Sequence, residues 1–314
     1  MLILDLRRIH RVLTSSSWIV PVFVLWAFFA RIIAGVTFYE YLPWVVFAIQ
    51  VIIAVLLMRI NHEYRLIERR CVFPATFFLM FTASDPNLYS NLAGNISALL
   101  VVVCLVVAFK NYHNTKSQTS LFNIALILTL GSLFCWTPLL FFIPLFWIGF
   151  QWFRSFNIRS FFASLLGVLI VYLFLSAWCL YLNDWTLFFD EIYRIGEIFE
   201  IHWLRLQWFD WILWTYIILL MVISAVNIFV SGFSGKVKIT LFFKFIYLIA
   251  IASMVLAFFF YAITDDIRSV IGVLLAFIAG YYFTMLDNNK WITYQIFFTI
   301  LLFVAYYVYL VGTG

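Results

Sequence analysis

Charged side chains are scarce in this sequence. Asp, Glu, Lys and Arg make up 11% of its 314 residues, whereas hydrophobic residues make up 66%. A typical soluble domain carries roughly 25% charged residues. With so few charged residues, the chain could not cover its apolar surface with polar groups in water. We therefore exclude a soluble globular protein and predict that lipid is its solvent.

Cysteine is also rare, and enzyme motifs are absent. Cys71, Cys104, Cys135 and Cys179 lie in or beside apolar runs and show no C-x-x-C spacing, so we predict neither a metal centre nor a cofactor. There is no Walker loop, G-x-S-x-G, H-E-x-x-H or Rossmann glycine pattern, which excludes an ATPase or a soluble-type hydrolase on motifs. The basic residues are scattered in short loops, and we expect no nucleic-acid partner.

What the sequence has is long hydrophobic runs. A helix needs about twenty apolar residues to cross the hydrocarbon core of a membrane. We therefore predict an all-α, polytopic transmembrane bundle of about eleven spans, forming a single integral membrane domain over residues 1–314. The predicted spans are 18–36, 43–58, 71–83, 92–109, 121–136, 138–153, 161–182, 211–230, 239–264, 270–286 and 291–311.

Two parts of this assignment have an alternative. The run at 71–83 is short, and the two runs within 121–153 are joined by very few residues, so each could cross fully or re-enter from one side. Pro138 and Pro144 remove backbone donors and predict a broken helix at 138–153.

The charge distribution predicts the orientation. Under this span assignment, 14 of the 19 Lys and Arg residues fall on one side, and only Arg194, Arg205 and Arg268 fall on the other. Since Lys and Arg are enriched in cytoplasmic loops, we predict that the N-terminus is cytoplasmic and the C-terminus is outside.

Short sequence patterns follow one another between residues 121 and 185. They are Leu121-Phe122-Asn123, Phe134-Cys135-Trp136-Thr137-Pro138, Phe156-Asn157-Ile158-Arg159, Gly167 and Leu182-Asn183-Asp184. In this part the chain resembles a family of uncharacterised multi-spanning inner-membrane proteins of Bacteroidota. The resemblance implies a multi-pass protein of the inner membrane of a Gram-negative cell, so that the outside is the periplasm. It implies no activity.

The longest segment between predicted spans, residues 183–210, contains candidate site residues. Its apolar residues recur at steps of three and four, which predicts an amphipathic helix at the periplasmic interface. Arg194 and Arg205 flank His202: guanidinium groups bind phosphate through paired hydrogen bonds, and an imidazole can act as acid or base. We therefore select His202 as a candidate catalytic residue and both arginines as candidate substrate-binding residues. A plain connector is the alternative.

A second group of candidates lies between two predicted spans. Asp265 and Asp266 are adjacent, and Arg268 follows closely. Paired carboxylates can serve as catalytic groups or bind a divalent cation, and Arg268 could bind an anionic substrate. The alternative is that these residues are solvated loop residues that mark the topology.

Arg31 is a charge within the first predicted span. Such a charge is costly and indicates a functional site by default, so we select Arg31 as a candidate substrate-binding residue and expect Glu40 as its partner. The alternative is that it snorkels to the headgroups. Gln50, Asn95 and Asn227 are uncharged and could form hydrogen bonds between helices.

Two functions from different classes fit these observations. The first is handling or transfer of a polyprenyl- or lipid-linked glycan at the periplasmic leaflet, with membrane lipid as the partner. It is favoured by the arginines and histidine of residues 183–210. The second is a non-catalytic transporter, or a scaffold subunit of an envelope complex, favoured by the scarcity of acidic residues within the spans. A cavity open to the outer leaflet would favour the first, and a closed bundle with a flat apolar flank the second.

Overall fold

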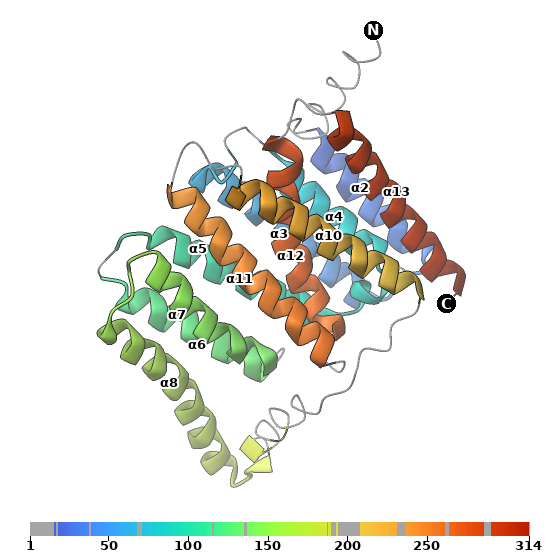
Figure 1. The fold of residues 1–314 in the computed structure, drawn as a ribbon. Helices are drawn as coiled ribbons and strands as arrows, with labels where there is room; N and C mark the ends of the chain where they lie inside the picture. The colour runs from blue at the N-terminus through green and yellow to red at the C-terminus, as the bar shows by residue number, and fades with distance from the viewer. Residues whose placement is uncertain are drawn as a thin grey trace.

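The computed structural model describes a bundle of α-helices (Figure 1). The residues described are 16, 18–37, 39–67, 71–114, 116–134, 137–186, 188–189, 193, 208–230, 237–260, 264–285 and 290–313. Within these ranges the α-helices are α2 (Ile19–Ile33), α3 (Tyr41–Tyr64), α4 (Phe73–Ser84), α5 (Leu92–Lys110), α6 (Gln118–Phe134), α7 (Phe142–Trp152), α8 (Ile158–Leu182), α10 (Trp208–Val230), α11 (Val237–Phe259), α12 (Thr264–Met285) and α13 (Lys290–Thr313).

Each predicted span corresponds to one of these helices. Seven of the described helices are long and apolar enough to cross a membrane, and α2, α4, α6 and α7 are shorter apolar helices. The prediction of an all-α transmembrane bundle is therefore confirmed, and the chain is a multi-pass integral membrane protein. The orientation of its termini stays a prediction.

The short spans differ from full-length crossings. α4 has 12 residues, which gives about 18 Å at 1.5 Å per residue, less than the ~30 Å hydrocarbon core. The predicted break at 138–153 is confirmed, because this run consists of a 3₁₀ helix, η2 (Thr137–Phe141), followed by α7. The Ser117 hydroxyl donates to the Ser155 carbonyl, so the start of α6 and the end of α7 lie together as the open ends of a hairpin.

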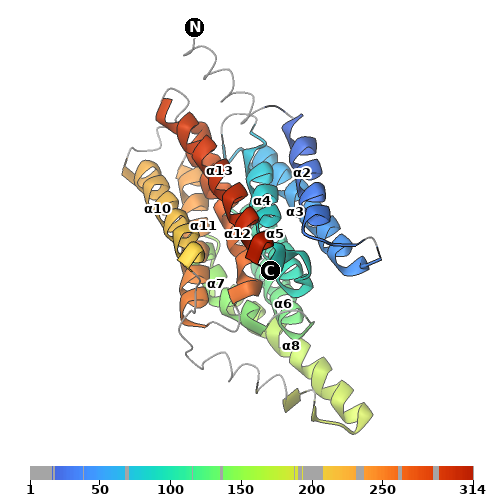
Figure 2. The same cartoon turned by 90° about the vertical axis from the view of Figure 1, so that its right-hand side faces the viewer.

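The centre of the bundle is formed by α4 and α12. Every residue of α4 is buried, and 94% of the apolar stretch of α12 is buried. α4 is largely apolar around its circumference, and so is α12 beyond its polar first turns, as expected for helices without a solvent-facing or lipid-facing side. Figure 2 shows α4 between α2 and α13, and α4 packs against both of them.

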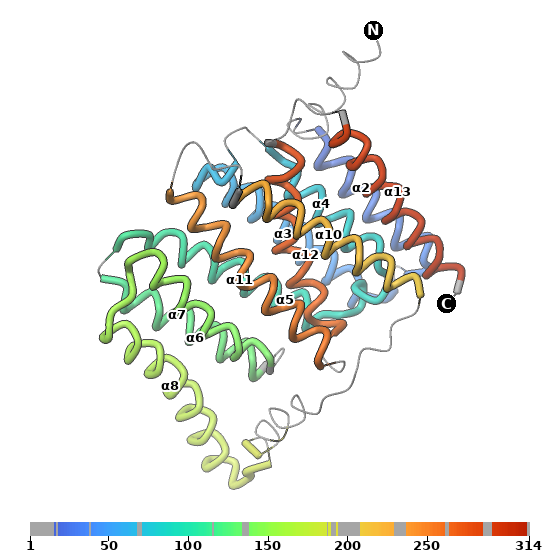
Figure 3. Tube along the Cα trace, viewed as in Figure 1, coloured from blue at the N-terminus to red at the C-terminus, as the bar shows by residue number. Residues whose placement is uncertain are grey.

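α8 lies at the edge of the molecule. Only 17% of its apolar stretch is buried, and it packs chiefly against α6 (Figure 3). Gly167 allows this contact, because a Cβ atom there would lie 2.7 Å from the Phe122 carbonyl oxygen. The outer side of α8 exposes large apolar side chains, among them Phe162, Leu173 and Phe174. In a membrane this side faces hydrocarbon.

Candidate functional site

The polar groups that could form a site gather around one short connection. α4 is followed by Asp85 and a 3₁₀ helix, η1 (Pro86–Tyr89), and α5 begins three residues later. The Asp85 carboxylate accepts a hydrogen bond from the Asn87 backbone N–H at 3.1 Å, and the Asn91 side chain accepts one from the Gly94 N–H at 2.8 Å. Asp and Asn are favoured caps because they satisfy the free N–H groups of a helix start. We call this end of the bundle the polar end.

Arg31 is fully buried and hydrogen-bonded at the polar end. Its guanidinium donates to the Ala27 carbonyl at 2.7 Å and to Gln50 Oε1 at 2.5 Å. Gln50 Nε2 donates to Asn95 Oδ1 at 3.0 Å, and Asn95 Nδ2 donates to the Asn91 carbonyl at 2.6 Å. One chain of hydrogen bonds therefore joins α2, α3 and α5. The expectation that Gln50 and Asn95 bond between helices is confirmed.

The predicted partner of Arg31 is wrong. The exposed Glu40 carboxylate instead accepts from the Thr37 hydroxyl at 3.3 Å. Snorkelling is also wrong, because the guanidinium turns back along α2 and lies over the Phe47 ring at 4.6 Å and the Tyr89 ring at 4.4 Å. A buried cation is stabilised by aromatic faces and by neutral acceptors as well as by a carboxylate. Arg31 therefore has no need of a carboxylate partner.

Asp85 and Arg268 form an ion pair between the end of α4 and the start of α12. Arg268 Nη1 lies 3.0 Å from Asp85 Oδ2, and the two side chains are only 11% and 7% exposed. Burial raises the pKa of the Asp85 carboxyl, and the positive charge of Arg268 acts in the opposite direction. Asp265 lies 3.7 Å from the same guanidinium, but its side chain is 70% exposed.

Asp265 and Asp266 do not converge on one point. Both lie in the first turn of α12, which begins at Thr264 and not at about residue 270 as predicted. Asp266 accepts a hydrogen bond from Asn91 Nδ2 at 2.8 Å, whereas Asp265 faces Arg268. The start of α12 also touches α5 closely, because a Cβ atom on Gly94 would lie 2.7 Å from the Asp266 carbonyl oxygen. No metal-binding group of three or more His, Cys, Asp or Glu side chains occurs among the described residues.

Helices α10 and α13 complete the polar end. The Tyr306 hydroxyl donates to Asp210 at 2.7 Å. Tyr306 also interacts electrostatically with Asp85 and Arg268. The site therefore includes Asp85, Asn91 and Tyr306, which the sequence pattern did not select. Only the cap spacings, Asp85 to Asn87 and Asn91 to Gly94, could have indicated that the first two are fixed.

The seven candidates from the sequence have different outcomes. Arg31, Asp265, Asp266 and Arg268 all lie at the polar end. The remaining three, Arg194, His202 and Arg205, lie outside the described residues, as does most of the predicted amphipathic segment 183–210. The roles assigned to them stay predictions.

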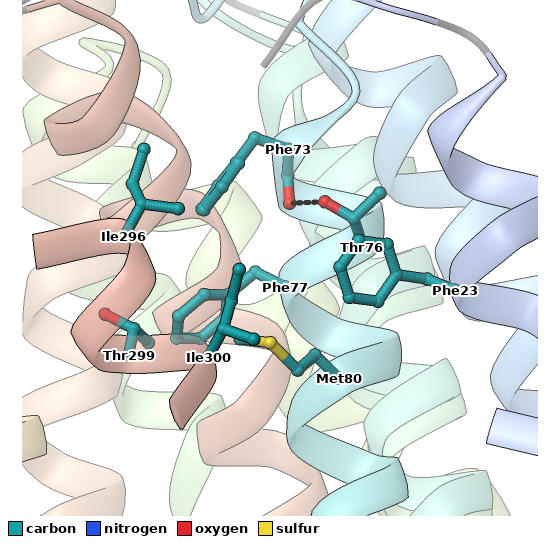
Figure 4. Close-up of a pocket in the computed structure, with 8 residues that line it drawn as sticks. All are labelled: Phe23, Phe73, Thr76, Phe77, Met80, Ile296, Thr299 and Ile300. Atoms are coloured by element: carbon teal, nitrogen blue, oxygen red, sulfur yellow. Dashed lines mark hydrogen bonds between the residues drawn. The ribbon is translucent and has the colours of Figure 1, made fainter. Parts of the chain in front are cut away.

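An apolar groove runs along α4 between α2 and α13. Its larger part has a volume of about 200 Å³ and is lined by Val22, Phe23, Trp26, Met80, Ser84, Ile300, Phe303 and Val304. A narrower part continues towards Phe73, and Phe23, Met80 and Ile300 line both parts (Figure 4). Ser84, at one end of the groove, directly precedes Asp85 of the ion pair.

No protein-family model, curated protein or solved structure matches this chain. Its function is therefore inferred from the polar end and the groove.

Proposed function

We propose that this protein handles a lipid-linked substrate, specifically a polyprenyl-linked glycan, at the periplasmic leaflet of an inner membrane. The observation that carries the proposal is the position of the groove. It is apolar along its length and reaches Ser84, the residue before the Asp85–Arg268 ion pair. Ligand sites are commonly apolar hollows with a few fixed polar groups at one side. A lipid chain in the groove would place its headgroup near such groups.

The charged side chains at the polar end suit a phosphate-bearing headgroup. Arg268 has five N–H donors, and the contact with Asp85 uses one nitrogen. Its remaining donors can bind phosphate oxygens. Asp265 is exposed beside it and could accept a proton from a sugar hydroxyl group. The sequence predicts that residues 183–210 form an amphipathic helix at the periplasmic interface. Arg194, His202 and Arg205 would add to this site if that helix lies over the polar end.

A non-catalytic role is favoured by a different observation. The lipid-facing side of α8 is a long apolar flank on a helix held chiefly by α6. Such a flank is suited to contact with another membrane protein of an envelope complex. A scaffold would need the apolar side chains of segment 183–210 for its stability, but it would not need the two arginines of that segment.

The amount of lipid that co-purifies with the protein separates these two functions. If residues 183–210 bind a phosphate-bearing lipid, Arg194→Gln or Arg205→Gln should weaken retention by roughly 1.5–3 kcal/mol, the value of a hydrogen bond to a charged group. The melting temperature should stay nearly unchanged. Lipid is measured by mass spectrometry of the purified variants. Phe188→Ala and Ile192→Ala serve as comparison variants. The proposal would be contradicted if the arginine variants retain the normal amount of lipid while Phe188→Ala and Ile192→Ala have lower melting temperatures.

The leaflet assignment has its own test. Asp265 lies at the polar end, whereas Lys116 follows the far end of α5, and both side chains are exposed. In a variant without native cysteines, Asp265→Cys should react with an impermeant thiol reagent in intact spheroplasts. Lys116→Cys should react only after lysis, because Lys and Arg remain on the cytoplasmic side. Labelling of residue 116 from outside would reverse the topology and place the polar end in the cytoplasm.

A further inference from the structure

The wide part of the groove has room for part of one hydrocarbon chain. Its lining follows α4 from Phe73 to Ser84, which at 1.5 Å per residue is about 16 Å. That is about half of the ~30 Å hydrocarbon core, the depth of one leaflet. The wide part, which Met80 and Ser84 line on α4, has a volume of about 200 Å³, whereas the narrow part towards Phe73 has about 10 Å³, enough for about one water. The wide part therefore has room for several methylene groups, and a longer chain requires the narrow part to widen.

The surroundings of the groove favour a chain that enters from the lipid. The neighbouring outward side chains, Val22 and Leu25 on α2 and Leu301 and Val308 on α13, are apolar and exposed. Phe23, Met80 and Ile300 line both the narrow and the wide part, so the two parts form one continuous passage. The Met80 side chain has three rotatable bonds and adapts its shape to a flexible ligand. A ligand with one chain fits this passage better than a phospholipid with two.

A small cluster of side chains, which we call the wall, lies beside the groove at the polar end. Ala27, Ala30, Ala83 and Tyr307 pack together, and Trp26 of the groove packs against them. The Tyr307 hydroxyl of α13 donates to the Ala30 carbonyl of α2 at 2.6 Å. Three of the four side chains are single methyl groups. Tyr307 is therefore the only large side chain in this cluster.

Arg31 lies directly behind this wall. Its Nη1 bonds the carbonyl of Ala27, a residue of the wall. Its guanidinium stacks on Tyr89, whose hydroxyl donates to the carbonyl of Ala83, another wall residue, at 2.5 Å. Arg31 Nε is fully buried and has no hydrogen-bond partner among the described groups. A buried donor without a partner is costly, and a phosphate oxygen would satisfy it.

From these observations we infer that the groove binds the chain of a polyprenyl phosphate and that Arg31 binds its phosphate. The inference rests on the proposed function; it names the chain site and assigns the phosphate to Arg31 and not to Arg268. The phosphate reaches Arg31 when the Tyr307 side chain leaves the wall, which breaks one hydrogen bond to α2. This inference gives Arg31 the substrate-binding role that the sequence analysis proposes for it.

Binding of added lipid to the purified protein tests the groove. The probes are undecaprenyl phosphate, undecaprenol and phosphatidylglycerol, and bound lipid is counted by native mass spectrometry. Ile300→Trp fills the groove and should lower undecaprenyl phosphate binding about tenfold or more. Leu173→Trp, on the exposed outer side of α8 and away from the groove, should leave binding unchanged. Equal binding by the two variants would overturn the groove as the chain site.

The same probes test Arg31. The protein should bind undecaprenyl phosphate about tenfold or more tightly than undecaprenol, since charge-assisted hydrogen bonds to phosphate are strong. Arg31→Gln should remove this preference while undecaprenol binding persists. Should Arg31→Gln fail to fold, Tyr307→Phe provides the second measurement: loss of the hydrogen bond to Ala30 should speed undecaprenyl phosphate binding. An unchanged preference in Arg31→Gln, or an unchanged rate in Tyr307→Phe, would overturn the role of Arg31 behind this wall.

Two outcomes separate this inference from the proposed function. If phosphatidylglycerol competes as well as undecaprenyl phosphate, the groove is a general lipid site and the inferred specificity is wrong. If undecaprenyl phosphate binds as expected but protein from cells carries no glycan-bearing lipid, the groove inference stands and the proposed function fails.

Discussion

Asp85→Ala should destabilise the protein by about 3–5 kcal/mol, the usual effect of removing one member of a buried ion pair. The Arg268 side chain, 11% exposed, would keep its charge and lose its nearest carboxylate, 3.0 Å away. The change would also remove the acceptor that caps η1 at the Asn87 N–H. The measurement is thermal unfolding of the purified protein in detergent, compared with the unmodified chain.

The structure offers a matched control for this change. Asp265 faces the same guanidinium at 3.7 Å, but its side chain is 70% exposed. Asp265→Ala should therefore change stability by no more than about 1 kcal/mol. The double variant Asp85→Leu with Arg268→Met should regain much of the loss, because an apolar pair leaves no charge without a partner. Equal melting temperatures for Asp85→Ala and Asp265→Ala would show that burial of the Asp85–Arg268 pair contributes nothing to the stability of the protein.

Arg31→Leu is expected to destabilise the protein on the order of 2–3 kcal/mol, as for a buried hydrogen-bonding network that loses one member. Gln50 Oε1 and the Ala27 carbonyl lose their donor, and the Phe47 and Tyr89 rings lose the cation between them. One effect opposes this loss: a charge at mid-membrane costs about 2.5–3.5 kcal/mol on insertion scales and less near the interface. We expect the lost contacts to outweigh it, because four groups surround the guanidinium.

Arg59→Leu is the control for Arg31→Leu. Arg59 is 78% exposed and lies 4.0 Å from Glu63, so its removal should cost about 0–1 kcal/mol. The double variant Arg31→Leu with Gln50→Leu should be less destabilised than the sum of the two single changes, because both changes break the same Arg31–Gln50 hydrogen bond. Asn95 Oδ1 loses its donor in the Gln50→Leu single variant and in the double variant alike. A higher melting temperature for Arg31→Leu than for the unmodified chain would mean that Arg31 is tolerated and not stabilising.

Contacts across the bundle account for what could not be predicted about the site. Arg31 and Gln50 are 19 positions apart, and Asp85 and Arg268 are 183 apart. No local pattern marks such pairs, because they depend on how α2, α3, α4 and α12 pack. Glu40 was expected to pair with Arg31 because it is an acid near in sequence. Yet an acid at the surface is solvated by water, whereas a buried guanidinium takes the acceptors within its reach.

The amino-acid sequence by itself determined that the apolar runs of the described residues are helices, since hydrocarbon accepts only backbone that is hydrogen-bonded within its own segment. Long apolar runs must therefore be helices, whatever their neighbours. The sequence did not determine where each helix begins and ends, because α12 starts at Thr264 and not at about residue 270. Tertiary structure alone decided that α4 and α12 are central and that α8 lies at the edge, because runs of similar hydropathy do not reveal which helices face lipid. It also decided that Arg31, Asp85 and Arg268 lie at one end of the bundle beside the groove. The reason is that each of these charges is stabilised by groups on helices distant in sequence.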